Sequence, residues 1–232
     1  MKNIVSEYDG IETISSVWHV LTEEQLYYLN RHCIVRRFKK NELVYSEGEE
    51  STHVVCVAKG KLKIYRKGAG GRSQIVRVVK PGEMCAYRAM FAGEPFVTNA
   101  SAIEASELYM ISQDVIKTLL SQNFDLAWYF ISKLSFDLGV ADKRSVSLTQ
   151  KHVKGRLAES LIFLRDNFGF EEDGKTLAAN LSREDIANLS NMTTSNAIRT
   201  LSWMAKENIV EVDGRKIKFV DEEYLTFLSK NG

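Results

Sequence analysis

The stretch LSREDIANLSNMTTSNAIRTLSW, residues 181–203, predicts two short helices joined by a tight turn. Ser182 is placed to cap the first helix, with Asp185 three positions on as its capping-box partner. Thr193 is the N-cap candidate of the second helix, after a turn over residues 191–193. This arrangement has the shape of a helix-turn-helix reader of the DNA major groove. A pair of surface helices in an ordinary helical domain would show the same caps, so the rest of the chain must distinguish the two interpretations.

The second helix of this pair has an apolar and a polar face. Apolar residues recur at spacings of one, three and four, which predicts that they pack inward. They are Ala197, Ile198, Leu201 and Met204 or Ala205. Polar side chains that can reach base edges or phosphates stand at the N-terminal end of the other face. They are Thr194, Ser195, Asn196 and Arg199.

A predicted strand pair directly after these helices favours the DNA interpretation. Two alternating runs, residues 209–212 and 216–220, flank an Asp-Gly dipeptide at 213–214, which is typical of a β-hairpin. A winged helix-turn-helix requires a hairpin at this place, and Arg215 and Lys216 lie at its tip. An ordinary edge hairpin is the alternative, but the position after the second helix favours the winged motif.

The composition is that of an ordinary globular protein. The chain has 232 residues, 44% hydrophobic and 26% charged, with a formal net charge of +1. No stretch approaches the roughly 20 apolar residues of a membrane span, and the charged N-terminal residues 2–12 contain no apolar signal core. Cys33, Cys56 and Cys85 are widely spaced and form no CxxC pair, which predicts buried thiols rather than disulfides or metal ligands. These features predict a cytoplasmic protein without membrane contact.

The C-terminal segment is not basic. From residue 151 onward, twelve Lys and Arg stand against thirteen Asp and Glu, a net charge of −1. DNA-binding domains are usually basic. Any DNA affinity should therefore depend on local charges and on two copies of the chain acting together.

Residues from about 36 to 110 predict β structure. Short β-branched or aromatic runs include residues 53–58, 61–65 and 74–79, and glycines separate the runs at turn-like intervals. The last two runs flank a glycine-rich loop and are expected to pair as a hairpin. Regular short strands with glycine turns favour a small barrel or sandwich. Before them, Thr22 and Gln25 predict a capped helix.

The hydrophobic period changes to three and four from Ser112 onward. It predicts a short capped helix through residue 120 and a longer helix that begins at residue 123 or 125. The longer helix carries an apolar stripe, made of Leu126, Phe130, Leu134, Leu138, Ala141 and Leu148. Roughly 25 residues extend about 37 Å, more than one small barrel covers. Pairing with the same helix of a second chain is therefore preferred, with packing on the chain's own barrel as the alternative. A further helix is predicted over 154–168.

This order of parts resembles the Crp–Fnr family of bacterial transcription regulators over residues 21–220. The resemblance is carried by residues 38–42, 47–49, 59–63 and 81–84, together with the two reader helices. It implies an α+β fold with a cyclic-nucleotide-binding-like β-roll (a double-stranded β-helix or jelly roll) as the sensor domain, a long dimerisation helix and a C-terminal winged helix-turn-helix. The implied boundaries are 1–122 for the roll, 123–151 for the long helix and hinge, and 152–232 for the winged helix-turn-helix.

The resemblance also implies partners. They are a second copy of the chain, double-stranded DNA with a near-palindromic operator, and RNA polymerase. The residues themselves give little support to an enzyme, because the chain has four scattered histidines and neither a nucleophile elbow nor a phosphate-binding loop. The iron–sulfur branch of the family is excluded, since its N-terminal cysteine cluster is absent.

Family features of the sensor are only partly present. In the cyclic AMP receptor branch, a glutamate holds the ribose, an Arg-Ser pair holds the cyclic phosphate and a Thr-Ser pair on the long helix contacts adenine. Tyr87 aligns with the glutamate, and residues 96–97 and 141–142 align with the two pairs. A cyclic phosphate needs a cation or several N–H donors, and no arginine lies between Arg88 and Arg144. The effector is therefore expected to be a small molecule other than cyclic AMP, or absent, and no cofactor is assigned. The candidate effector pocket consists of Gly82, Glu83, Tyr87, Arg88, Phe96, Val97, Ala141 and Asp142.

The family's reader pattern, Ser-Arg-Glu-Thr-Val-x-Arg, aligns with residues 193–199. Arg199 matches the final arginine and is expected to read a base, because a bidentate guanidinium–guanine pair is the commonest specific contact. Thr194 and Ser195 replace the first arginine and the glutamate, which implies an unusual operator. The predicted DNA-binding residues are Ser182, Thr193, Thr194, Ser195, Asn196, Arg199, Arg215 and Lys216.

Two alternatives stay open at this point. One is a haem- or redox-responsive sensor of the same family, for which His53, Cys56, Met84 and Cys85 are candidate ligands or thiols. The other is a ligand-binding module that has lost DNA binding, which the near-neutral C-terminal segment favours.

Overall fold

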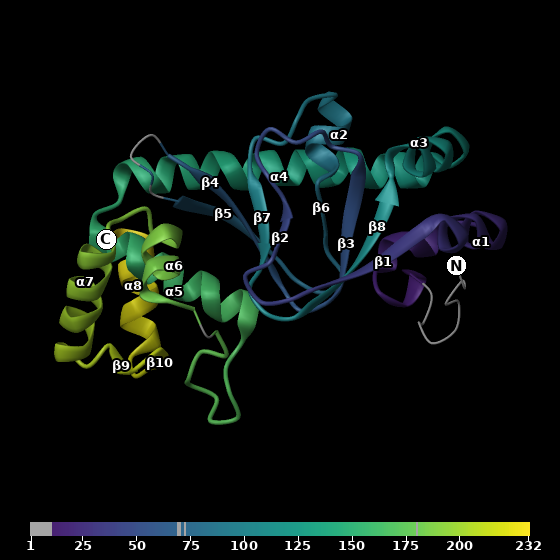
Figure 1. Cartoon of the computed structure of the whole chain (residues 1–232). Coiled ribbons are helices and arrows are strands. Elements are labelled where there is room, and N and C mark those ends of the chain that lie inside the picture. The colour runs from purple at the N-terminus through teal and green to yellow at the C-terminus, as the bar shows by residue number, and fades with distance from the viewer. Residues whose placement is uncertain (1–10, 69–70, 72, 180) are drawn as a thin grey trace. The chain divides into compact units, whose positions relative to one another are not determined.

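Figure 1 shows a computed structural model of the chain, which describes residues 11–68, 71, 73–179 and 181–232. Most of the charged N-terminal segment in which no signal core was found lies outside the described residues. The chain divides into two compact units. The first contains the described residues up to Arg66 together with Arg77–Leu138, and the second contains Lys67–Val76 and Gly139–Gly232.

The strands between residues 33 and 112 form two sheets, as the resemblance implies. Within the described residues, one four-stranded sheet has the order β1-β8-β3-β6 and the other has the order β2-β7-β4-β5. The pairing of β4 with β5 confirms the hairpin predicted from the glycine-rich loop. The strands are β1 Cys33–Phe38, β2 Leu43–Tyr45, β3 His53–Lys59, β4 Leu62–Lys67, β5 Ser73–Val79, β6 Met84–Cys85, β7 Asn99–Ala102 and β8 Ser106–Ser112.

Strand β3 is buried on both faces. Val54 and Cys56 lie in an apolar cluster with residues of the surrounding helices, whereas Val55 and Val57 lie in a second cluster between the two sheets. Successive side chains of a strand point to opposite faces, so the continuous apolar run at 53–58 reflects a strand covered on both sides. Full burial of each such side chain contributes about 1.5–3 kcal/mol.

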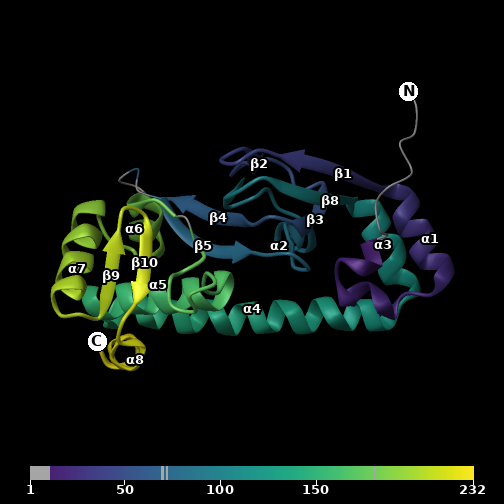
Figure 2. The same ribbon diagram turned by 90° about the horizontal axis from the view of Figure 1, so that it is seen from below.

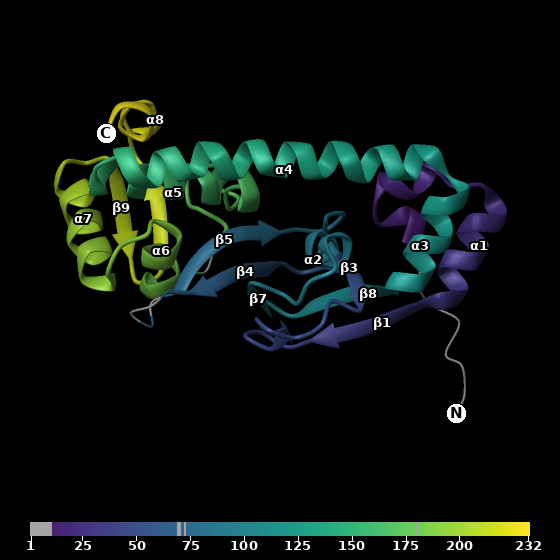
Figure 3. The ribbon, with the colours of Figure 1, turned by 90° about the horizontal axis from the view of Figure 1, so that it is seen from above.

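The helices of the first unit begin where the sequence places their caps. Thr22 and Gln25 form a capping box, and the side chain of Ser112 accepts a hydrogen bond from the backbone N–H of Val115. Asn123 Oδ1 accepts from the N–H of Leu126 at 2.9 Å, which fixes the start of the long helix. Figure 3 shows α1 and α3 side by side near that start. The elements are the short 3-10 helices η1 Ile11–Thr13 and η2 Ser16–Val20, then α1 Glu23–His32, α2 Tyr87–Ala92, α3 Gln113–Gln122 and α4 Phe124–Gln150.

The structure corrects the predicted stripe on α4. Leu126 and Phe130 are buried, 0% and 2% exposed, in the cluster beneath the sheet of their own chain, and Leu134 packs against that cluster. Residues at a constant spacing of four rotate by about 40° per step around a helix, so Leu138 has already turned outward and is 64% exposed. The first half of the stripe therefore packs on its own roll, which was the alternative to dimer packing.

A different row of α4 is exposed. Phe124, Trp128, Ile131 and Leu138, named here the outer stripe, follow one another at spacings of four, three and seven. Their exposed fractions are 74%, 58%, 52% and 64%. Spacings of three, four and seven are those of a coiled-coil seam.

The second unit is mainly helical. Its helices include α5 Val153–Phe168, α6 Arg183–Leu189, α7 Thr194–Lys206 and α8 Glu222–Asn231, and its hairpin consists of β9 Val210–Asp213 and β10 Lys216–Phe219. Figure 2 shows this hairpin beside α6 and α7. The α+β fold class is confirmed. None of the helices in the described part of the chain is long and apolar enough to cross a membrane.

Candidate functional site

The two reader helices have the caps that the sequence predicts. Ser182 and Asp185 form a capping box at the start of α6, with Ser182 Oγ accepting from the Asp185 N–H at 3.0 Å. Thr193 Oγ1 accepts from the N–H of Asn196 at 3.2 Å and begins α7. Between them, Met192 is buried and Asn191 has a positive φ of 49°. Each cap uses a hydroxyl lone pair, and Ser182 Oγ also donates its hydrogen to Asp185 Oδ2 at 2.8 Å, so the Ser182 hydroxyl is engaged within the protein.

Helix α7 separates its faces largely as expected. Ala197, Leu201 and Met204 are buried, whereas Thr194, Ser195 and Arg199 are exposed. Ile198 is the exception: it is 46% exposed, although the sequence placed it on the inward face. Positions 197 and 198 are about 100° apart on a helix, and only Ala197 faces the core.

Asn196 and Arg199 form a pair on α7. Arg199 Nη2 donates to Asn196 Oδ1 at 2.5 Å, one helical turn away. A guanidinium that is already held by a hydrogen bond to a neighbouring side chain loses less conformational entropy when it forms a bidentate contact with a base. Asn196 thus positions Arg199 in addition to its expected phosphate contact.

The wing turns at Gly214 and Arg215, one residue later than the Asp-Gly dipeptide suggested. Asp213 and Lys216 are directly paired across the two strands, and Gly214 has a φ of 52°. Arg215 is exposed at this tip. Arg183, which sequence reasoning passed over, donates from Nη2 to the carbonyl oxygen of Gly214 and joins the start of α6 to the wing. Its only sequence signal is an arginine just inside a capped helix.

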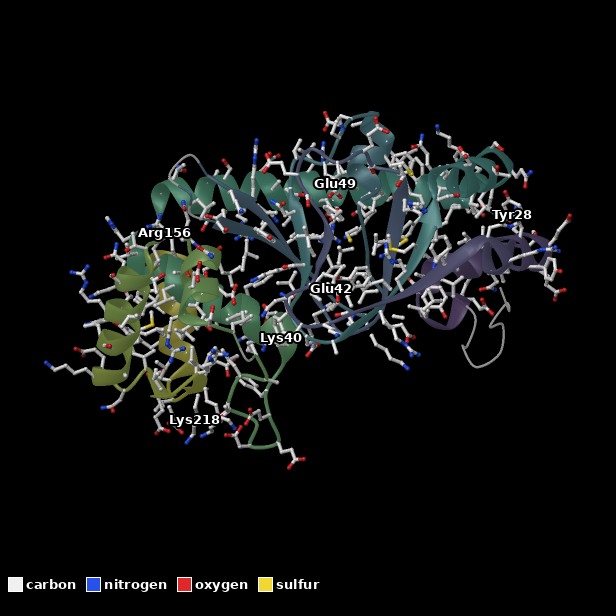
Figure 4. The ribbon with its side chains drawn as sticks, in the orientation of Figure 1. Tyr28, Lys40, Glu42, Glu49, Arg156 and Lys218 are labelled. Atoms are coloured by element: carbon white, nitrogen blue, oxygen red, sulfur yellow. The ribbon has the colours of Figure 1, made fainter. Side chains whose placement is uncertain are left out.

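Two lysines of the wing are paired with acids of the same unit. Lys216 Nζ lies 2.9 Å from Glu171 Oε2, and this contact raises the pKa of Lys216. Lys218 Nζ, labelled in Figure 4, lies 3.0 Å from Glu211 Oε2. In these pairs the charge of each lysine, which would attract phosphate, is locally compensated by a carboxylate.

The loop that carries Glu171 is fixed against the wing by backbone bonds. The N–H of Leu177 donates to Ile217 O at 2.9 Å, and the N–H of Phe219 donates to Lys175 O at 2.9 Å. Asp173 accepts hydrogen bonds from Thr176 and from the Lys175 N–H, which lower its pKa to about 2. Glu171 is therefore held beside the wing by a structured turn.

Glu171→Gln is expected to strengthen DNA binding. It releases the ammonium of Lys216 to a phosphate, so log K against log salt should become steeper by about one unit. The measurement is fluorescence anisotropy with a random-sequence duplex between about 50 and 200 mM salt. Glu172→Gln is the matched control, because it removes the same charge from the neighbouring exposed residue. Equal slopes for the two variants would contradict the role given to the ion pair.

The hydroxyl group of Tyr87, a candidate effector residue, makes its hydrogen bonds within the protein. Its ring is buried, and its hydroxyl donates to Asp137 Oδ2 and accepts from Arg77 Nη1 at 3.0 Å. Arg77 also lies 3.0 Å from Asp137, and Lys133 lies 2.9 Å from the same carboxylate. Burial opposes ionisation of Asp137, but these donors lower the pKa of its carboxyl group. Arg77 and Asp137 were not predicted, since they lie 60 residues apart and neither belongs to a local motif.

The other candidate pocket residues of the first unit make separate contacts. Arg88 pairs with Glu94 at 2.5 Å, and Phe96 stacks on Tyr45 with ring centroids 3.9 Å apart. Phe96 and Tyr45 line an open cavity of about 290 Å³, together with Glu49, which Figure 4 labels. Two further candidates lie in the turn before β6, where Gly82 has a φ of 84° and Glu83 Oε2 accepts from the Lys80 N–H. Val97, another candidate, is 39% exposed. Ala141 and Asp142 are exposed residues of the second unit.

The three cysteines are thiols, and Cys56 and Cys85 are buried. Burial raises the pKa of Cys33, Cys56 and Cys85 to about 12 in each case. A thiol with so high a pKa is a poor nucleophile at neutral pH. Among the described residues, no three His, Cys, Asp or Glu side chains are grouped as a metal site.

The geometry defines a class of protein: a transcription regulator with an antiparallel β-roll and a C-terminal helix-turn-helix. Sequence profiles agree, since the cyclic nucleotide-binding domain matches residues 35–123 and the Crp-like helix-turn-helix domain matches residues 155–228. The chain belongs to the Crp–Fnr family of transcription regulators.

The following relatives are distantly similar to this chain. The CRP-like cAMP-activated global transcriptional regulator of Mycobacterium tuberculosis is 23% identical, over 81% of this chain and 84% of that protein. The anaerobic regulatory protein of Bacillus subtilis is 23% identical, over 82% of this chain and 81% of that protein. The solved structure of FixK2 from Bradyrhizobium japonicum covers 84% of this chain and 96% of its own, with a TM-score of 0.75 and 21% identity. At this identity the structural likeness establishes the fold.

Proposed function

We propose that this protein is a homodimeric, sequence-specific DNA-binding regulator of the bacterial cytoplasm. The observation that carries the proposal is the exposed polar face of α7, with Thr194, Ser195 and Arg199, next to a wing whose tip carries Arg215. The proposed DNA-binding set is the one expected from the sequence, with Arg183 added as the residue that holds the wing. The domain limits of 1–122, 123–151 and 152–232 belong to this proposal.

A dimer follows from the outer stripe of α4. Phe124, Trp128 and Ile131 are more than half exposed, which is unfavourable for large apolar side chains in water. Pairing of two α4 helices along this seam removes them from water. Two-fold symmetry then predicts a near-palindromic operator, with half-site centres about 34–36 Å apart. RNA polymerase is the partner that family membership supports.

The sensor is proposed to respond to a molecule other than cyclic AMP, or to none. A cyclic phosphate requires cationic or N–H donors, and the stacked ring of Phe96 offers neither. Tyr87 is bonded to Arg77 and Asp137, so its hydroxyl is engaged within the protein. An effector acts only through unequal affinity for the DNA-competent and DNA-incompetent arrangements.

The alternatives make different predictions. A thiol-based sensor needs an accessible thiolate, and the burial and high pKa of Cys56 and Cys85 weigh against it. A haem sensor would instead purify with stoichiometric haem. A module that has lost DNA binding would shift no genomic fragment at any salt concentration. Immunoprecipitation of bound genomic DNA, followed by sequencing, would reveal the operator and the regulated genes together.

Arg199→Ala tests the reader directly. It is expected to weaken binding to the selected operator by about 1–3 kcal/mol and to relax the preference at one base pair per half-site. Arg215→Ala is the comparison, because loss of a phosphate contact should weaken all sequences alike and reduce the salt slope by about one. Competition binding against operators with single changes distinguishes the two. An equal loss on every sequence for Arg199→Ala would contradict base reading.

A further inference from the structure

Ile198 is an aliphatic side chain on an otherwise polar face of α7. It is 46% exposed, whereas Ala197 and Leu201 are 0% and 2% exposed. Residues three and four apart share one face of a helix. Ile198 therefore lies one turn beyond Thr194 and Ser195, the two polar residues at the start of the reading face, and next to Arg199 in the chain.

Packing within the protein explains this isoleucine only in part, because 46% of its surface is exposed. Single exposed apolar residues are common and by themselves indicate nothing. A β-branched residue, however, is a poorer helix former than alanine or leucine, because its side chain loses rotamer freedom. With nearly half its surface exposed and no advantage in helix propensity, Ile198 is not fully accounted for by the fold of α7.

The chemistry of the major groove supplies a reason. Base edges there present hydrogen-bond donors and acceptors, and the 5-methyl group of thymine is the apolar feature that an aliphatic side chain recognises. We propose that Ile198 is a specificity-determining residue that contacts the 5-methyl group of one thymine in each half-site. This inference rests on the proposed DNA binding and adds an A·T pair close to the base read by Arg199.

The expected change in affinity follows from the burial of one methyl group. Removing one methyl group from water is worth about 0.8 kcal/mol, which corresponds to an affinity change of about fourfold per half-site. Replacement of a thymine by deoxyuridine removes that methyl group and leaves its hydrogen-bonding edge unchanged. The contact can therefore be tested on either side of the interface.

The experiment begins with selection of the operator from a random duplex library by the full-length protein. Each thymine of the selected duplex is then replaced by deoxyuridine, one symmetric pair at a time, and affinity is measured for the wild type, Ile198→Ala and Ile198→Val. Val220→Ala is the matched control, since Val220 is an exposed aliphatic residue, 45% exposed, outside α7.

Replacement of one symmetric thymine pair by deoxyuridine should weaken operator binding by the wild type and by Val220→Ala. The expected loss of affinity is roughly tenfold or more for both half-sites together. Ile198→Ala should lose the same affinity on the intact operator and show no further loss with deoxyuridine, while Ile198→Val keeps part of the methyl preference. Equal deoxyuridine effects in the wild type and Ile198→Ala, or none in the wild type, would overturn the assignment. Failure of the wild type to select any sequence would instead overturn the proposed sequence-specific DNA binding, and this inference with it.

Discussion

Trp128→Glu is expected to convert the proposed dimer to a monomer and to weaken operator binding by at least about a hundredfold. Trp128 lies in the middle of the outer stripe and is 58% exposed in the single chain. A glutamate at this place would put a charge into an apolar seam, where an unpaired charge is strongly disfavoured. A monomer holds one half-site only and so loses the gain of about 10²–10⁴ that two linked contacts give.

Sedimentation equilibrium and operator binding provide the two measurements. Phe136→Glu is the matched control, because Phe136 is also exposed on α4, at 65%, but lies outside the outer stripe. Circular dichroism should be unchanged in both variants, since neither side chain contributes to the buried clusters of its own chain. If the Trp128→Glu protein stays dimeric, the outer stripe is not the dimer interface. If the Phe136→Glu protein dissociates, the dimer interface lies on another face of α4.

The two apolar rows of α4 show what sequence periodicity can and cannot decide. The pattern predicted a long helix beginning at residue 123 or 125, and α4 begins at Phe124, because caps and helical spacing are local properties. It could not decide which apolar row packs on the roll. Leu126 and Phe130 are buried by residues such as Trp18 and Ile111, which lie far away in the sequence. Two apolar rows on one helix are distinguished only when the surface that covers one of them is known.

The reader helices show the same limit on a smaller scale. The caps at Ser182 and Thr193 are confirmed, since each depends on residues three positions away. The inward assignment of Ile198 is wrong, because two adjacent apolar residues fit the spacing and the core accepts only one. The pairing of Lys216 with Glu171 joins positions 45 residues apart, and no local pattern indicates it.

The Arg77–Tyr87–Asp137 cluster is the least predictable part of the molecule, because its members come from β5, α2 and α4. It joins the long helix to the roll within the first unit through a shared carboxylate. Arg77 and Asp137 have side chains 27% and 28% exposed, so water screens the pair only in part. Such a cluster is sensitive to loss of the carboxylate, which leaves the arginine without its counter-charge.

Asp137→Ala is expected to lower the free energy of unfolding of the first unit by about 2–3 kcal/mol, as estimated for a partly buried charged network. Tyr87→Phe should lower it by about 1 kcal/mol, because one hydrogen bond is lost while the ion pair stays. Urea unfolding at pH 7 measures both, with Arg88→Ala as the control, since Arg88 and Glu94 form an exposed pair.

The pH dependence separates the charge from the packing. The pKa of Asp137 is lowered in the folded protein, so its contribution is complete above the unfolded value of about 3.9 and disappears as the pH falls through the folded value. The stability difference between the wild type and Asp137→Asn should therefore be constant from pH 5 to 7 and shrink below about pH 4. A difference that persists unchanged at low pH would mean that Asp137 acts through shape and hydrogen bonding alone. A shrinking difference would establish that the charge of Asp137, which pairs with Arg77 of β5 and with Lys133 of α4, contributes to the stability of the first unit.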